Sequence, residues 1–177
     1  MQFPQSFRDV LFAKKPLNFA PGAEWQYSNT NYAIAGTILE KVSGMSLMAF
    51  LRSRIFDPLG MKSPIDLDHQ TLTQSDAAGY TRFGLGPARP AQPEGRGWLF
   101  AAGELAMTAR DLGVWDQSLL DGKLLTPSSL QEMIRTVPLK DGAPTNYGLG
   151  VGVSNAGGFP KLEHGGAVSG FVSFNAV

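Results

Sequence analysis

The chain has 177 residues, a length typical of one domain of roughly 100–200 residues. Its 15 Lys and Arg balance its 15 Asp and Glu, so the formal net charge is +0 and no basic surface for nucleic acid is expected. Cys is absent, which excludes disulfides, Cys-ligated metal sites and thiol nucleophiles. The apolar runs are far shorter than the roughly 20 residues that a membrane span needs, so no membrane span is expected.

Apolar spacing through the first 146 residues predicts helices separated by turns. The expected helices are 3–13, 31–43, 46–56, 109–121 and 127–134. Ser28 or Asn29 is the expected N-cap of the second helix, and Thr108 with Asp111 has the form of a capping box. Residues 57–60 are expected to form a turn.

Two other stretches differ from this helical pattern. Residues 63–97 are rich in Pro, Gly and polar side chains and predict a long surface loop with short strands at most near 79–82. Residues 147–177 alternate apolar and small residues and predict strands of an antiparallel sheet. The expected fold class is therefore α+β, with a mainly helical region over 1–146 and an incomplete antiparallel sheet over 147–177.

Three side chains in this pattern have reactive or ligand-binding chemistry. Tyr27 and Asn29 are two positions apart at a turn that enters a helix, where a phenol can transfer a proton and a carboxamide can hold a substrate amide. Alternatively, Tyr27 is a packed aromatic and Asn29 an N-cap. His164 precedes two glycines at the expected start of a strand, where a ligand could lie against the backbone.

Five stretches, taken in order, resemble the serine β-lactamase-related family, which includes class C β-lactamases, D-alanyl-D-alanine carboxypeptidases, D-aminopeptidases and similar esterases. They are Pro21-Gly22-x-x-Trp25-x-Tyr27-Ser28-Asn29-x-x-Tyr32, Asp57-Pro58-Leu59-Gly60-Met61, Ala102-Gly103-Glu104-Leu105-x-Met107-Thr108-x-x-Asp111-Leu112, Tyr147-Gly148-Leu149-Gly150 and His164-Gly165-Gly166-x-x-x-Gly170-Phe171. The resemblance covers nearly the whole chain. It implies an antiparallel sheet packed against helices, with the active site between them.

The resemblance also implies roles for individual residues. Tyr27 and Asn29 match the family's Tyr-x-Asn motif, with Tyr27 as the proton-transfer group and Asn29 as a ligand to the substrate amide. His164-Gly165-Gly166 matches the Lys/His-Thr/Ser/Gly-Gly motif at the sheet edge, with His164 catalytic and the two glycines binding substrate. The backbone N–H of Ala167 would be one oxyanion-hole donor.

The chain departs from the family at the nucleophile. Family members use the Ser of a Ser-x-x-Lys motif upstream of Tyr-x-Asn, whereas no serine here is followed three positions later by Lys. We therefore expect an internal fragment of a hydrolase, inactive on its own. His in place of Lys favours peptidase-like or esterase-like members over true β-lactamases, so the expected substrate is a small amide or ester.

Two alternatives remain open from the sequence. The chain could be a binding or self-assembly module, in which the open sheet edges and an exposed Phe171 and Phe174 pair with another copy. It could instead bind a metal through Asp66, Asp68 and His69, although adjacent ligands in a polar loop are usually a solvated charge run. We expect no metal and no cofactor.

Overall fold

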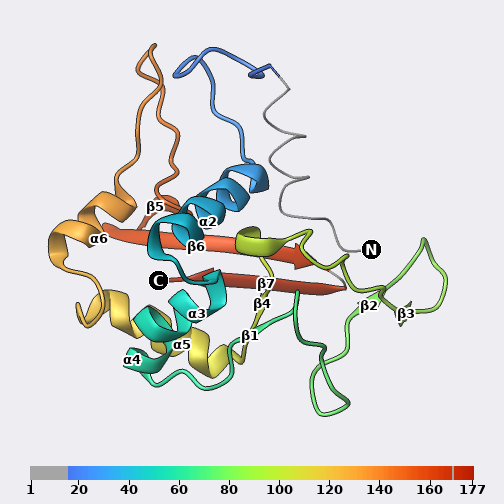
Figure 1. The fold of residues 1–177 in the computed structure, drawn as a ribbon. Helices are drawn as coiled ribbons and strands as arrows, with labels where there is room; N and C mark the ends of the chain where they lie inside the picture. The colour runs from blue at the N-terminus through green and yellow to red at the C-terminus, as the bar shows by residue number, and fades with distance from the viewer. Residues whose placement is uncertain (1–15, 169) are drawn as a thin grey trace.

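The computed structural model describes residues 16–168 and 170–177, and it contains both helices and antiparallel sheets (Figure 1). The α+β class predicted from the sequence is confirmed. The helix predicted over 3–13 lies outside the described residues.

Helix α2 (Asn29–Ser43) follows directly from the Tyr-x-Asn stretch and fixes its position. Ser28 is the N-cap residue, with an extended backbone and no side-chain capping bond, so Asn29 is the first helical residue. Gly44 ends the helix in the left-handed conformation, at φ 69°, where its N–H donates to the carbonyl of Glu40. A glycine at this position avoids the strain that a side chain would add.

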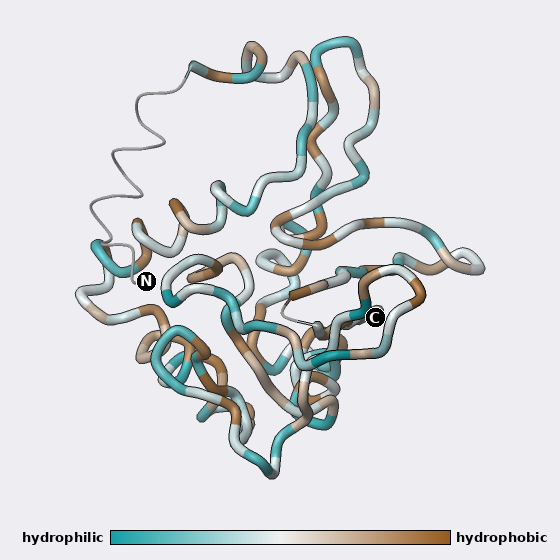
Figure 2. The backbone as a smooth tube through the Cα atoms, turned by 90° about the vertical axis from the view of Figure 1, so that its right-hand side faces the viewer, coloured by the Kyte–Doolittle hydropathy of each residue, from teal (hydrophilic) through white to brown (hydrophobic). Residues whose placement is uncertain are grey.

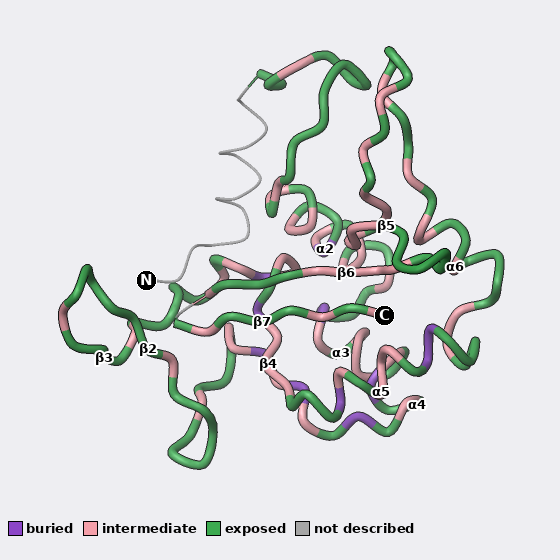
Figure 3. Tube along the Cα trace, turned by 180° about the vertical axis from the view of Figure 1, so that it is seen from behind, coloured by how far each residue is buried: buried purple, intermediate pink, exposed green. Residues whose placement is uncertain are grey.

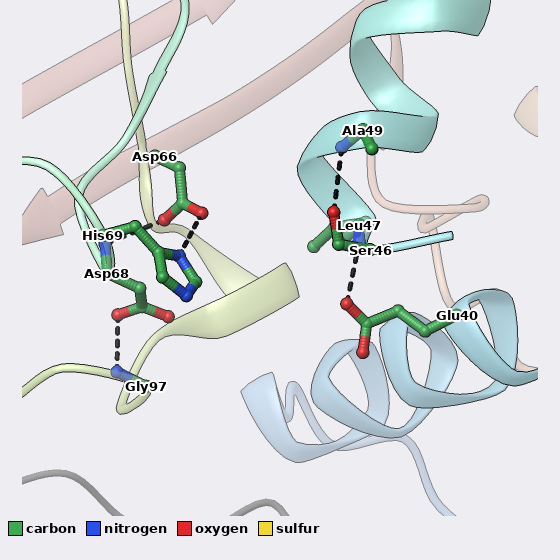
Figure 4. A network of polar contacts seen from close by, with 8 residues as sticks. All are labelled: Glu40, Ser46, Leu47, Ala49, Asp66, Asp68, His69 and Gly97. Atoms are coloured by element: carbon green, nitrogen blue, oxygen red, sulfur yellow. Dashed lines mark hydrogen bonds and ion pairs between the residues drawn. The ribbon is translucent and has the colours of Figure 1, made fainter. Parts of the chain in front are cut away.

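The next helical stretch is longer than the sequence indicates. It consists of α3 (Leu47–Leu51), the π-helical η1 (Arg52–Phe56) and α4 (Asp57–Leu59). Ser46 Oγ accepts from the Ala49 N–H and Glu40 Oε1 accepts from the Leu47 N–H, so two of the free donors at this start are paired (Figure 4). Residues 57–59, expected in a turn, extend the helix, and the reversal comes only at Gly60, at φ 71°.

The predicted loop over 63–97 contains short strands, and hydrogen bonds join it to other parts of the chain. Strand β1 (Ile65–Asp66) pairs with β4 (Leu105–Ala106), and β2 (Tyr80–Thr81) pairs with β3 (Arg89–Pro90). Strand β2 confirms the short strand expected near 79–82. The 3₁₀ turn η2 (Phe100–Ala102) follows and packs against α2.

Helix α5 (Ala109–Leu120) begins with half of the predicted capping box. Thr108 Oγ1 accepts from the Asp111 N–H, as expected. The Asp111 carboxylate does not reach back to Thr108, because it accepts from the N–H and hydroxyl of Ser63, at 2.7 and 2.8 Å. Ser63 Oγ in turn accepts from the Thr108 N–H at 3.0 Å, so a residue far away in sequence completes the cap. Helix α6 (Pro127–Ile134) is capped by Thr126 and has Pro at its first position.

The main sheet is antiparallel, in the order β5 (Gly152–Ala156), β6 (Phe159–Val168), β7 (Phe171–Ala176). His164 pairs with Asn175, whose amide donates to Asp116 of α5 at 2.7 Å, so this face of the sheet is joined to the helices. On the opposite face Val172 is 87% exposed and Phe174 is 67% exposed. Figure 3, seen from behind, shows that none of the described helices or strands lies in front of β6 and β7.

The buried apolar core is small and lies in the helical part of the chain. Hydrophobic positions occur along helices and strands alike (Figure 2), but the buried ones are Leu47, Phe56, Met61, Phe100 and Leu119. Among the described residues no single helix is long and apolar enough to span a membrane, although α2 and the 47–59 helix pass that test together as a pair bent by 74°.

Candidate functional site

Tyr27 and His164 meet in the structure although they lie near opposite ends of the chain. Their ring centroids are 5.9 Å apart with an interplanar angle of 40°. Tyr27 comes from the segment before α2, and His164 comes from the middle of β6. Tyr27 remains 47% exposed and lines the hollow described below.

Asn29 lines the same hollow as Tyr27 and His164. The alternative in which Asn29 caps the helix is wrong, because Ser28 occupies the cap position. The Asn29 carboxamide makes no hydrogen bond to any residue in the described part of the chain, and the residue is exposed. Both ends of the amide are therefore available to a substrate.

The β6 edge next to His164 presents unpaired backbone donors. Leu162 and Val177 exchange both backbone hydrogen bonds, at 2.7 and 2.8 Å. Because such pairs alternate along an antiparallel ladder, the N–H groups of Gly165 and Ala167 point away from β7. The β5 ladder ends at the pair Gly152–Glu163, so it does not extend to either donor. Within the described part of the chain, the Ala167 N–H therefore has no backbone partner in either ladder.

The hollow has a volume of about 1470 Å³ and is bounded by the helices and by β6 and β7. It also includes Gly165, Gly166 and Ala167. Its charged lining residues are Asp76, Asp116 and Glu163, and no Lys or Arg occurs among the described residues that line it. Glu163 lies on the opposite face of β6 from His164 and forms an ion pair with Lys161, so Glu163 does not orient the imidazole.

Tyr147 is a central member of the site that the sequence reasoning did not assign to it. Its hydroxyl lies 3.0 Å from His164 Nε2, and its ring contacts Tyr27 edge-on with centroids 6.1 Å apart. Trp25 also contacts the Tyr147 ring, at 5.4 Å between centroids and an interplanar angle of 49°. The available signal is the Tyr147-Gly148-Leu149-Gly150 stretch, to which the family resemblance assigns no role in the site.

Local backbone contacts explain why Tyr147 is followed by alternating glycines. A Cβ on Gly148 would overlap the carbonyl oxygen of Met133, and one on Gly150 would come within 3.2 Å of the Tyr32 hydroxyl. Asn146, just before Tyr147, has φ 52°, and its carbonyl accepts from the Val153 N–H at 2.9 Å. The turn therefore packs against α6, α2 and β5 at once and holds the tyrosine in place.

Tyr147 and Tyr32 keep their protons at neutral pH. Burial, together with the neighbouring Tyr32 and Tyr27, raises the pKa of Tyr147 to about 12. Burial also raises the pKa of Tyr32 above its ordinary value, while a hydrogen bond with Tyr147 partly offsets that rise.

The candidate metal ligands Asp66, Asp68 and His69 are engaged in hydrogen bonds with one another and with the backbone (Figure 4). Asp66 lies 2.6 Å from His69 Nδ1 and accepts from the Asp68 N–H, while Asp68 accepts from the Gly97 N–H. Within the described ranges, no group of three or more His, Cys, Asp or Glu could hold a metal ion. The hydrogen bond from the Gly97 N–H to Asp68 therefore joins the start of the 63–97 loop to its end.

Comparison with known proteins identifies the family. The Beta-lactamase family model matches residues 5–177, so the chain belongs to the Beta-lactamase family. This agrees with the resemblance found in the sequence motifs, and the fold is that of the penicillin-binding-protein-like serine hydrolases.

Individual relatives are aminopeptidases and amidases. The D-aminopeptidase of Brucella anthropi is 30% identical over 169 residues, which are 95% of this chain and 32% of that protein. The D-stereospecific amidohydrolase from Streptomyces sp. matches with a TM-score of 0.83 and 30% identity over 99% of this chain and 53% of that chain. D-amino acid amidase from Ochrobactrum anthropi SV3 matches with a TM-score of 0.73 and 26% identity, over 97% and 53% of the two chains.

The chain is thus a partial match to its relatives. It spans about a third of the length of the curated relatives and about half of the solved chains.

Proposed function

We propose that this chain supplies the Tyr-x-Asn and His-Gly-Gly walls of the active-site cleft of a serine hydrolase that acts on small amides or esters. The observation that carries the proposal is the contact between Tyr27 and His164, at 5.9 Å between ring centroids, above a hollow that Asn29 also lines. Tyr27 is assigned as the proton-transfer group and Asn29 as the group that holds the substrate amide. The Ala167 N–H is assigned as one oxyanion donor.

The charges around the hollow favour a substrate with a free amine. The carboxylates of Asp76 and Asp116 line the hollow, whereas Glu163 is paired with Lys161 on the opposite face of β6, so Asp76 and Asp116 make the hollow attract a cation and repel a carboxylate. A substrate such as an amino acid amide fits this potential better than a penicillin, which has a carboxylate. The names of the relatives, D-aminopeptidase and D-amino acid amidase, support the same substrate class.

The 177-residue chain by itself is proposed to perform no covalent hydrolysis. None of its serines has a Lys three positions later, so no side-chain amine is placed one helical turn away to take the hydroxyl proton. After incubation with a labelled fluorophosphonate, mass spectrometry should find no acylated or phosphonylated serine. Stoichiometric labelling of any serine would show that the chain contains its own nucleophile.

Ligand binding tests the assignment of the cleft. An NMR titration with D-phenylalanine amide should shift the signals of His164 and of the Gly165 and Ala167 amides. The Tyr27→Phe substitution should weaken this binding, whereas Tyr80→Phe, at an exposed tyrosine outside the hollow, should not. Shifts confined to other parts of the chain, or equal weakening by both substitutions, would refute the assignment.

A second candidate function is self-assembly through the sheet. β7 is an edge strand, and Val172 and Phe174 on its uncovered face are largely exposed. Phe171, expected to be exposed, is only partly exposed, since it lies on the face that is turned to the hollow. An open edge beside exposed apolar side chains is a pairing site for another copy. The octameric penicillin-binding protein homologue from Pyrococcus abyssi shares the fold, with a TM-score of 0.71.

A further inference from the structure

We propose that Asp116 is a specificity-determining residue, whose carboxylate binds an ammonium group at the end of a lysine-like substrate side chain. Asp116 lies on α5 and lines the hollow, where it is half-buried. The inference rests on the proposed function, because the reacting end of the substrate is placed at the Ala167 N–H, the assigned oxyanion donor. It goes further by naming the substrate side chain that the hollow selects.

Asp116 is the charged member of an otherwise apolar helix face. Residues at positions i, i+3, i+4 and i+7 of a helix share one face. On α5 the residues at this spacing that line the hollow are Leu112, Trp115, Asp116 and Leu119. A carboxylate among apolar neighbours is less hydrated than one on an open surface, so its attraction to a cation is stronger.

Within the described part of the chain, Asp116 has one hydrogen-bond partner and forms no ion pair. Asn175 Nδ2 donates to Asp116 Oδ1 at 2.7 Å, which leaves the second oxygen, Oδ2, for a ligand. The other two carboxylates at the hollow are engaged differently. Asp76 is exposed and its Oδ2 accepts from the N–H and hydroxyl of Thr73, while Glu163 forms an ion pair. Asp116 is therefore the carboxylate best placed to receive a cation.

The register of the sheet sets the distance from Asp116 to the reacting end of the hollow. Asn175, which holds the carboxylate, pairs with His164, three residues before Ala167 on β6. Three residues of about 3.3 Å along the strand and one strand spacing of about 4.8 Å place Asn175 about 11 Å from Ala167. The carboxylate lies beyond Asn175, so hydrogen bonds of about 2.9 Å at each end leave roughly 5–8 Å between the carbonyl oxygen and the cation of the ligand.

A lysine side chain spans this gap. Its five bonds from Cα to the ammonium group extend about 6 Å, whereas the α-ammonium group of an amino acid amide is bonded directly to Cα and falls short. Gly166 lies on the same face of β6 as His164 and lines the hollow, so it adds no side chain to the path of the ligand. The hollow thus selects a distal ammonium group.

NMR titrations with D-lysine amide and D-norleucine amide at about pH 7 test the proposal. The two ligands share the α-amine and the four-carbon side chain, and the lysine ammonium stays charged because its ordinary pKa is about 10.4. D-lysine amide should bind the unmodified chain about tenfold more tightly or better, the gain from one charge-assisted hydrogen bond, and shift the side-chain amide signals of Asn175. Equal affinities for the two amides would overturn the proposal.

Two substitutions test whether the preference depends on this carboxylate. Asp116→Asn keeps an oxygen that can accept from Asn175 but removes the charge, so the preference for D-lysine amide should disappear while D-norleucine amide binds as before. The control Asp121→Asn removes a carboxylate at the exposed end of α5, outside the hollow, and should leave the preference unchanged. A preference that survives Asp116→Asn, or that is lost equally in both variants, would contradict the proposal. If Asp116→Asn does not fold, the two ligands on the unmodified chain and the Asn175 signals decide.

D-norleucine amide also separates this inference from the proposed function. If it shifts the Gly165 and Ala167 amide signals but D-lysine amide binds no better, the cleft assignment stands and the role of Asp116 is wrong. If neither ligand shifts those signals, the proposed function fails, and the role of Asp116 fails with it.

Discussion

The close contact between α2 and η2 provides the sharpest stability test, because α2 places Tyr27 and Asn29. Gly36 is buried in α2, and a Cβ there would overlap the Ala101 methyl group and come within 2.8 Å of Phe100 Cε1. Gly113 is also inside a helix, α5, but a Cβ there would meet nothing within 4 Å. Gly36→Ala and Gly113→Ala therefore bring the same gain in helix propensity but differ in what the new methyl group contacts.

The expected magnitudes have opposite signs. Gly113→Ala should stabilise the chain by about 0.5–1 kcal/mol, because Ala loses less backbone entropy than Gly in a helix. Gly36→Ala gains the same amount but overpacks a backbone-supported contact, at a cost of about 1–3 kcal/mol. The net expectation for Gly36→Ala is a loss of about 1 kcal/mol. The propensity terms cancel in the difference between the two variants, which leaves the overpacking cost itself, about 2 kcal/mol.

Urea unfolding followed by circular dichroism measures both free energies of unfolding, provided that the slopes of the two transitions agree. A Gly36→Ala variant that is as stable as Gly113→Ala would show that α2 does not lie against η2 at this distance. In that case the placement of Tyr27 and Asn29 relative to β6 would lose its support as well.

Three further predictions concern ionisation and association. In an alkaline titration of tyrosinate absorbance, the last tyrosine should lose its proton near pH 12, and this step should be absent in Tyr147→Phe; a titration that is complete by about pH 11 would contradict this. Because folded Tyr147 keeps its proton while the unfolded chain loses it, the free energy of unfolding should fall as pH rises from about 10 toward 12. Hydrogen bonds from the Ser63 N–H and, second, from its hydroxyl hold the pKa of Asp111 below 3.8, so the stability that these bonds contribute should be present above pH 3.8 and be lost as pH falls through the pKa of folded Asp111. Asp111→Asn should therefore lower the free energy of unfolding more at neutral than at acid pH, and an equal loss at both would refute the prediction. If the sheet edge pairs, the unmodified chain should self-associate in sedimentation across a concentration series, and Val172→Lys should weaken this association about tenfold or more. The control Val42→Lys, at another exposed valine, should associate like the unmodified chain.

Local sequence rules predicted the parts of the fold that depend on neighbouring residues. The end of α2 at Ser43, the Thr108 cap, the start of α6 at Pro127 and the strands after Tyr147 all follow from patterns within a few positions. The turn expected at 57–60 is the counterexample. Pro58 fits the first turn of a helix, so the helix continues to Leu59, and only Gly60 takes the left-handed conformation that ends it.

Features that depend on distant residues were not accessible from local patterns. Ser63 completes the cap of α5 from 48 positions away, and no spacing rule links it to Asp111. The hydrogen bond between Tyr147 and His164 likewise requires the β5–β6 hairpin to place the two side chains together. The family resemblance supplied Tyr27, Asn29 and His164, but it assigned no role to Tyr147.

The central claim is that the Tyr-x-Asn and His-Gly-Gly stretches form one site, and an NMR measurement of nuclear Overhauser effects between side chains tests it most directly. With ring centroids 5.9 Å apart, the ring protons of Tyr27 should show cross-peaks to those of His164. These cross-peaks should vanish in Tyr27→Leu, while those between Tyr147 and His164 remain. A folded chain in which Tyr27 shows no cross-peak to His164 would contradict the account.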